Sequence, residues 1–125
     1  MVVKITVKGL EEAKRFLDNK AKEIENKGKA ALTMASLHMQ NEVKLSIAGF
    51  KSEPTSVDTG RFLNSVDINI GKIDAIIFSD IPYANHLEYG TTRIKPRSHF
   101  RNSKARNQDK VIEIIEKEIK SWKMD

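Results

Sequence analysis

Residues 83–101 read YANHLEYGTTRIKPRSHFR and contain two of the three histidines, both tyrosines and three arginines. Gly90 in this stretch can adopt the positive φ that a side chain resists, which predicts that an ordered segment ends there in a turn. Pro96 disfavours a helical conformation at Lys95, so we expect the chain to stay extended beyond the turn. A loop that is basic, aromatic and rich in turn residues predicts a surface that binds a partner. The rest of the chain is interpreted as the scaffold that presents it.

Positive charge is concentrated directly after this glycine. Between Thr91 and Arg106 there are six Lys or Arg residues and no acidic residue, whereas the whole chain carries a net charge of +5. The remainder is therefore close to neutral. Three interpretations remain open: the basic side chains form a solvated face, they face packaged DNA in a channel, or they bind an acidic subunit. The residues of this predicted basic loop are Arg93, Lys95, Arg97, Arg101, Lys104 and Arg106.

The composition excludes several classes of protein. With 125 residues the chain predicts a single domain that spans residues 1–125. The absence of cysteine excludes disulfides, thiolate catalysis and zinc–thiolate sites. The segment MVVKITVKG lacks the basic leader and the apolar core of a signal peptide, and no apolar run approaches the ~18 residues of a membrane helix. We therefore expect a protein without membrane contact, which is made in a reducing cytoplasm or packaged into a particle assembled there.

Hydrophobic periodicity predicts the secondary structure of the first half. Residues 2–8 alternate β-branched apolar with polar residues, which predicts a half-buried strand. From Leu10 an apolar or small residue recurs every three or four positions, which predicts a long helix that ends near Ala48. Unbroken, this helix would be roughly 57 Å long. We expect it to protrude or to break, with Gly28 as the hinge, because glycine is unfavourable inside a helix.

The middle of the chain predicts a loop, a short helix and a hairpin. Residues 48–56 contain a helix-ending glycine near their start, Gly49, and a proline, Pro54, which is typical of a loop. Asp58 and Thr59 can then cap the first turn of a short helix. Residues 66–70 and 75–79 are rich in apolar residues and close in sequence, which predicts an antiparallel hairpin.

The last element predicted is a helix from about Asn102 to about Lys123, where apolar residues again recur at helical spacing. The predicted fold class is therefore α+β. A long N-terminal helix and a C-terminal helix are expected to pack on a small, mainly antiparallel β-sheet.

Two segments carry a family resemblance. VDTGRFLNSV, at residues 57–66, is similar to the Asp-Thr-Gly-x-Leu-x-x-Ser segment that follows the long helix in the phage tail-completion family, the small neck proteins of long-tailed bacteriophages. Residues 83–101 resemble that family's Tyr-Ala-x-x-x-Glu-x-Gly-Thr run, which is followed by a proline and an aromatic residue before a C-terminal helix. The order and spacing of the elements match over nearly the whole chain. Phe62 stands where the family often has leucine.

This resemblance implies a structural protein with no catalysis and no cofactor. It implies an α+β subunit that completes the end of a tail tube, or joins tail to head, through a homo-oligomeric ring, and a ring of six is the arrangement expected. The implied partners are phage tail-tube and head-connector proteins, with DNA in the channel as a further partner. The implied location is the tail or neck of a virion or prophage, assembled in the host cytoplasm. Loops 49–57 and 90–101 are expected to meet adjacent rings or tube proteins.

The motif residues admit two roles. In the first motif they form a cap and turn that hold the loop against the hairpin, or they contact a neighbouring subunit. In the second, Glu88 is either a surface acid or a partner for an arginine across a ring interface, because it lies beside Arg93 and Arg97 in the sequence. The candidate residues are Asp58, Thr59, Gly60, Arg61, Ser65, Tyr83, Glu88, Tyr89, Gly90 and Thr91.

The alternative function is a nucleic-acid-binding module that uses the basic loop over residues 91–106. Only Phe100 lies near these basic residues, so base stacking on a single strand finds little support. Sequence-specific reading finds little support either, because no helix-turn-helix or ribbon signature is present. Contact with duplex phosphates is the form of binding that the loop predicts.

Metal and catalytic sites find little support in the sequence. His86 and Glu88 match the His-x-Glu of zinc deaminases, but that chemistry needs cysteine ligands. His38 and Glu42 lie four residues apart on one helical face and are interpreted as a surface pair, since no third ligand is in view. The sequence contains no glycine-rich phosphate loop and no serine in a nucleophile elbow.

Overall fold

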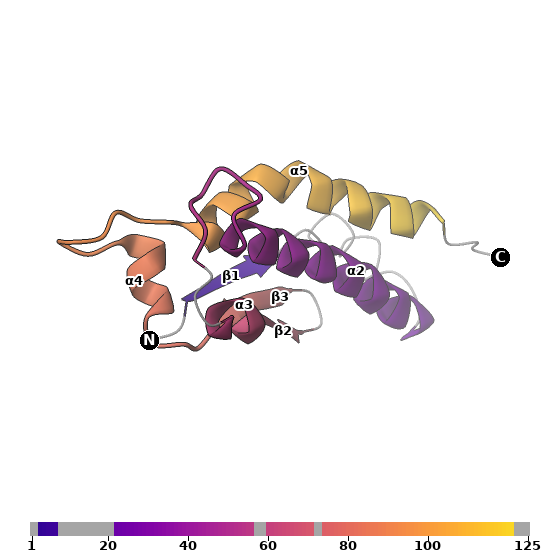
Figure 1. Cartoon of the computed structure of the whole chain (residues 1–125). Coiled ribbons are helices and arrows are strands. Elements are labelled where there is room, and N and C mark those ends of the chain that lie inside the picture. The colour runs from indigo at the N-terminus through magenta and orange to yellow at the C-terminus, as the bar shows by residue number, and fades with distance from the viewer. Residues whose placement is uncertain (1–2, 8–21, 57–59, 72–73, 122–125) are drawn as a thin grey trace.

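The computed structural model describes residues 3–7, 22–56, 60–71 and 74–121. Helices α2 and α5 pack together and on a three-stranded antiparallel sheet, so the predicted α+β class is confirmed (Figure 1). None of the described helices is long and apolar enough to cross a membrane. In chain order the elements are β1 (Val3–Val7), α2 (Lys22–Ile47), α3 (Arg61–Ser65), β2 (Asp67–Ile70), β3 (Ala75–Ser79), α4 (Ala84–Tyr89) and α5 (His99–Lys120).

The sheet has the order β1-β3-β2, and both pairings are antiparallel. The predicted hairpin is confirmed as β2 and β3, and the predicted first strand pairs with the other edge of β3. Ile5 and Ile68 both lie opposite Ile77. Because side chains alternate between the two faces of a strand, these three residues share one face, which packs against the helices.

Helix α2 provides the largest part of the core. Its predicted apolar stripe is confirmed over the second half of the helix, where its residues are buried. The predicted hinge at Gly28 is wrong, because α2 continues through it without a break. Gly28 is itself buried, and packing of the stripe beyond it outweighs a propensity cost of about 1 kcal/mol. The expected beginning near Leu10 lies outside the described residues. The buried stripe residues are Leu32, Ala35, Met39, Val43 and Ile47.

Helix α5 lies along α2 (Figure 1) and buries Val111 and Ile115 in the core. It begins at His99, three residues before the predicted start near Asn102. Ser98 makes no side-chain cap at this end, and the cap comes instead from Glu88 on α4. Periodicity within the segment therefore could not indicate the first turn. The predicted end at Lys123 lies outside the described residues.

Candidate functional site

The predicted turn at Gly90 is confirmed, and it ends helix α4. Gly90 has φ 77° and ψ 173°, a region that side chains rarely adopt. Its N–H donates to the carbonyl of His86 at 2.8 Å. A Cβ atom at this position would lie 2.8 Å from the carbonyl oxygen of Ile94 and 2.8 Å from Cδ of Pro96. Both the backbone conformation and the close approach therefore require glycine.

Beyond Gly90 the chain does not stay extended, because residues 91–94 close a tight turn. The N–H of Thr91 donates to the carbonyl of Ile94 at 2.8 Å. The Thr91 hydroxyl accepts from the N–H groups of Arg93 (3.2 Å) and Ile94 (3.1 Å). We call residues 90–97 the finger, since Figure 1 shows this loop projecting beyond α4 at the end of the molecule opposite the C-terminal end of α5.

The base of the finger is held to the body of the protein. The N–H of Arg97 donates to the carbonyl of Leu87 at 2.6 Å, and its guanidinium donates to the carbonyl of Thr55 at 2.6 Å. The tip is different: Arg93, Ile94 and Lys95 are all exposed, with Ile94 at 42%. An ordered backbone therefore presents an apolar side chain between two cations.

Glu88 is not a surface acid, so that prediction is wrong, whereas its pairing with an arginine across a ring interface stays a prediction. Its side chain is 1% exposed, and it accepts from the N–H groups of Phe100 and Arg101, both at 2.9 Å. The carboxylate thereby caps the first turn of α5, where free N–H groups favour negative charge. α4 and α5 are linked through this one residue, which explains where α5 begins.

Arg101 completes the link between the two helices. Its Nε lies 3.2 Å from Oε2 of Glu88, and its Nη2 donates to the Glu88 carbonyl (2.8 Å) and to the Ser98 hydroxyl (2.9 Å). The guanidinium also lies 4.3 Å from the centroid of the Tyr89 ring, a cation–π contact. Arg101 therefore binds within its own chain.

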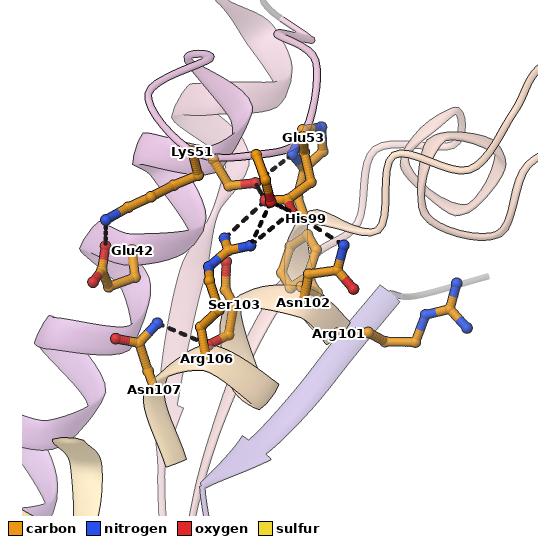
Figure 2. Close-up of polar contacts among 12 residues, drawn as sticks. Glu42, Lys51, Glu53, His99, Arg101, Asn102, Ser103, Arg106 and Asn107 are labelled. Atoms are coloured by element: carbon orange, nitrogen blue, oxygen red, sulfur yellow. Dashed lines mark hydrogen bonds and ion pairs between the residues drawn. The ribbon is translucent and has the colours of Figure 1, made fainter. Parts of the chain in front are cut away.

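A second buried carboxylate, which the sequence analysis missed, lies between the loop after α2 and the first turns of α5. Glu53 is 6% exposed, and the guanidinium of Arg106 donates to both of its oxygens, at 2.7 and 2.8 Å. Ser46 and Ser52 donate their hydroxyl protons to it, and Asn102 donates at 3.1 Å. Figure 2 shows Arg106 directed at Glu53, whereas Arg101 points away from this group.

These contacts decide the charge of the pair. Burial alone would raise the pKa of Glu53, but the hydrogen bonds from Arg106, Ser46, Ser52 and Asn102 outweigh it and hold that pKa well below its ordinary value. The hydrogen bond to Glu53 in turn raises the pKa of Arg106. Both groups are therefore charged near neutral pH. We call Glu53, Arg106 and the residues that bind them the buttress.

His99 extends the buttress to the next part of the loop. It is fully buried, with Nδ1 2.7 Å from the Ser46 hydroxyl and Nε2 2.7 Å from the Ser56 hydroxyl. Burial lowers the pKa of His99, the charge of Glu53 raises it, and the charges of Arg97 and Arg106 lower it. The net result is a pKa of about 4. His99 is therefore neutral near pH 7, so one ring nitrogen donates and the other accepts.

The predicted basic loop over residues 91–106 is not a single loop. Arg101, Lys104 and Arg106 lie on α5, and Arg101 and Arg106 are bound by the buried carboxylates of Glu88 and Glu53. Only Arg93 and Lys95 lie in the exposed tip of the finger. Sequence proximity thus grouped cations that the fold separates into two kinds.

Residues of the first motif support the fold where the structure describes them. Gly60 has φ 82° and stands at the N-terminus of α3. The Ser65 hydroxyl donates to the carbonyl of Phe62 at 2.6 Å and lies 2.6 Å from the Ser79 hydroxyl in β3. Arg61 is exposed. The predicted cap residues Asp58 and Thr59 lie outside the described residues.

Phe62 brings the two motifs together. Its buried ring lies 6.0 Å from the Tyr83 ring in an edge-on contact, 6.0 Å from His99 and 6.4 Å from Phe100. Such aromatic contacts add specificity to apolar burial. The first motif thereby supports the segment that carries the finger.

The other predicted pair, His38 and Glu42, binds residues outside α2. Nε2 of His38 lies 3.1 Å from Oδ1 of Asn107 and 3.8 Å from Glu42, and Glu42 lies 2.9 Å from Nζ of Lys51. Among the residues that the structure describes, no three His, Cys, Asp or Glu side chains form a group that could hold a metal ion.

Comparison with known proteins adds no relative. No family model matches the chain, and neither a curated protein nor a solved structure matches it. The resemblance to the tail-completion family therefore depends on the two motifs and their order.

Proposed function

We propose that this protein is a structural subunit of a virion or prophage neck, which completes the tail end and joins tail to head through a ring of identical copies. The proposal gives the protein no catalytic role. The observation that carries it is the finger. Glu88 and Gly90 of the second motif support the scaffold, through a helix cap and a turn. The tip of the finger, which they position, is exposed and can contact another molecule.

The distribution of exposed apolar side chains supports several interfaces. Met34 and Leu37 project from α2, Phe50 from the loop after it, and Tyr89 from the end of α4. They therefore come from three different segments of the chain. A subunit that contacts copies of itself and also tail and head proteins needs apolar residues on several faces, since apolar surface supplies much of the affinity of protein interfaces.

The nucleic-acid alternative has fewer available cations than the sequence suggests. Arg101 and Arg106 are paired with buried carboxylates, and Arg97 donates to the loop after α2. Affinity for duplex DNA increases with the number of phosphates neutralised, so these engaged arginines contribute less than free ones. Arg93 and Lys95, which are exposed, could still contact the phosphates of DNA in the channel of a ring.

The test is reconstitution of head joining. Tails that lack the protein are mixed with purified protein and with heads, and the fraction of joined particles is counted by electron microscopy. We expect the wild-type protein to restore joining. No binding to tails or heads would overturn the proposed function. Salt-dependent binding to duplex DNA in the absence of particle binding would favour the alternative.

A further inference from the structure

The outward face of α5 has a composition complementary to the finger. Asp109, Ile112, Glu113 and Glu116 are exposed, and their spacing of three, four and seven residues places them on one side of the helix. Val111 and Ile115, which are buried, face the core instead. Ile112 is 42% exposed. We call these four residues the acidic stripe.

Cations flank the stripe, because Lys117 and Lys120 are also exposed and follow Glu113 and Glu116 by four residues. Lys110 lies 3.5 Å from Glu113, but both side chains are more than half exposed, and such surface pairs are weak and easily exchanged. An apolar side chain among three acids is thus offered to solvent. The finger offers the opposite arrangement, Ile94 between Arg93 and Lys95.

The two surfaces cannot meet within one molecule. Figure 1 shows the finger and the C-terminal half of α5 at opposite ends. A contact between them therefore joins two copies. It is heterologous, since one copy contributes its finger and the other contributes its acidic stripe. A heterologous contact repeats from copy to copy and closes into a ring where the rotation permits.

We propose that the finger of one subunit docks on the acidic stripe of a second copy, with Ile94 against Ile112 and the two cations against the acids. This contact deepens the proposed neck function and rests on it for closure into a ring. The ordered turn at Gly90 favours such docking, because a rigid loop loses little conformational entropy on binding.

The chain has no cysteine, so introduced thiols can report the contact directly. A double variant, Ile94→Cys with Ile112→Cys, is oxidised in concentrated protein and on particles that carry it, and is analysed on non-reducing gels. We expect a ladder of dimers, trimers and larger species that reductant collapses. Both positions are exposed, and circular dichroism verifies the fold of each variant.

Controls separate this geometry from others. Met34→Cys with Ile112→Cys pairs two exposed positions that the proposal does not bring together, and we expect it to give only background crosslinking. Each single variant should give no dimer above background. A dimer from Ile94→Cys alone would indicate a symmetric contact and overturn the proposal, as would a double variant no better than the mismatched pair.

Charge exchange tests the same contact independently. Arg93→Glu with Lys95→Glu, added to the double-cysteine variant, should reduce the crosslinked fraction about tenfold, because like charges then face each other. Glu113→Lys with Glu116→Lys should restore it. An unchanged ladder in the first variant would refute the docking mode.

The outcomes also distinguish the contact from the neck function. A ladder in protein that fails to join heads to tails would leave the contact established and the neck function refuted. Restored joining without a ladder on the assembled particles would support the neck function and refute the contact between finger and stripe.

Discussion

The buttress and the finger both contain basic residues, but these residues have opposite roles in the two regions. In the buttress, Arg106 donates to both oxygens of a buried carboxylate and so fixes the loop after α2 on α5. In the finger, Arg93 and Lys95 are exposed, and hydrogen bonds hold the backbone turn rather than these side chains. A run of basic residues therefore has no single function, since burial and binding partners separate its members.

Substitution of Glu53 should have the largest effect on the contrast between the two regions. Glu53→Gln keeps the shape but removes the charge that Arg106 binds, and we expect a loss of about 3 kcal/mol in the free energy of unfolding, at the lower end for a broken buried pair because Arg106 is partly exposed. Denaturant titration measures it. Glu113→Gln, in an exposed pair with Lys110, is the matched control and should change little; equal losses would show that the buttress is no stronger than a surface pair.

Acid should weaken the buttress through His99. Its pKa of about 4 lies below the ordinary 6.5, so between these values the unfolded chain binds more protons than the folded one. Stability is then complete above pH 6.5 and falls as the pH decreases towards 4, by roughly 3 kcal/mol in total. Unfolding free energies measured from pH 7 to 4.5 test this. His99→Gln should flatten the slope, while the exposed His86→Gln should leave it; a slope that survives His99→Gln would contradict the assignment.

Gly90 tests the finger itself. Gly90→Ala places a Cβ in a positive-φ conformation and against Ile94 and Pro96, and we expect a loss of about 2 kcal/mol. Thermal or denaturant unfolding measures it, with the exposed Thr92→Ala as the control. If Gly90→Ala were as stable as that control, the finger would not depend on this turn.

Two arginines give the smallest and sharpest contrast. Arg101→Ala leaves buried Glu88 without its cation but with two backbone donors, so we expect a loss of about 1 kcal/mol. Arg93→Ala removes an exposed charge and should change stability by less than about 0.5 kcal/mol. Parallel denaturant titrations compare the free energies of unfolding of the two variants. Equal losses would show that Arg101, which is bound to a buried carboxylate, contributes no more to stability than the exposed Arg93.

Local pattern predicted most of the fold. Alternation marked β1, the three-four spacing marked the stripe of α2, and the need for a positive φ marked Gly90, because each depends on residues close in sequence. The first turn of α5 was missed, since its cap comes from Glu88 on another helix.

The buttress could not be predicted for the same reason. Glu53 lies in a polar loop and Arg106 in a helix, so neither carries a local sign of burial, and only packing of α2 against α5 joins them. His99 gave no sign either, because its two serine partners precede it by a long separation in the chain. The same limit explains why six cations were grouped into one loop.

Head joining by a variant of the finger is the most direct test of the role proposed for its exposed cations. Tails that lack the protein receive either wild-type protein or Arg93→Glu with Lys95→Glu, and joined particles are counted by electron microscopy alongside denaturant titrations of both proteins. We expect the variant to unfold at the wild-type denaturant concentration and yet to join few heads. Joining at the wild-type level by the folded variant would contradict a role of these cations in assembly.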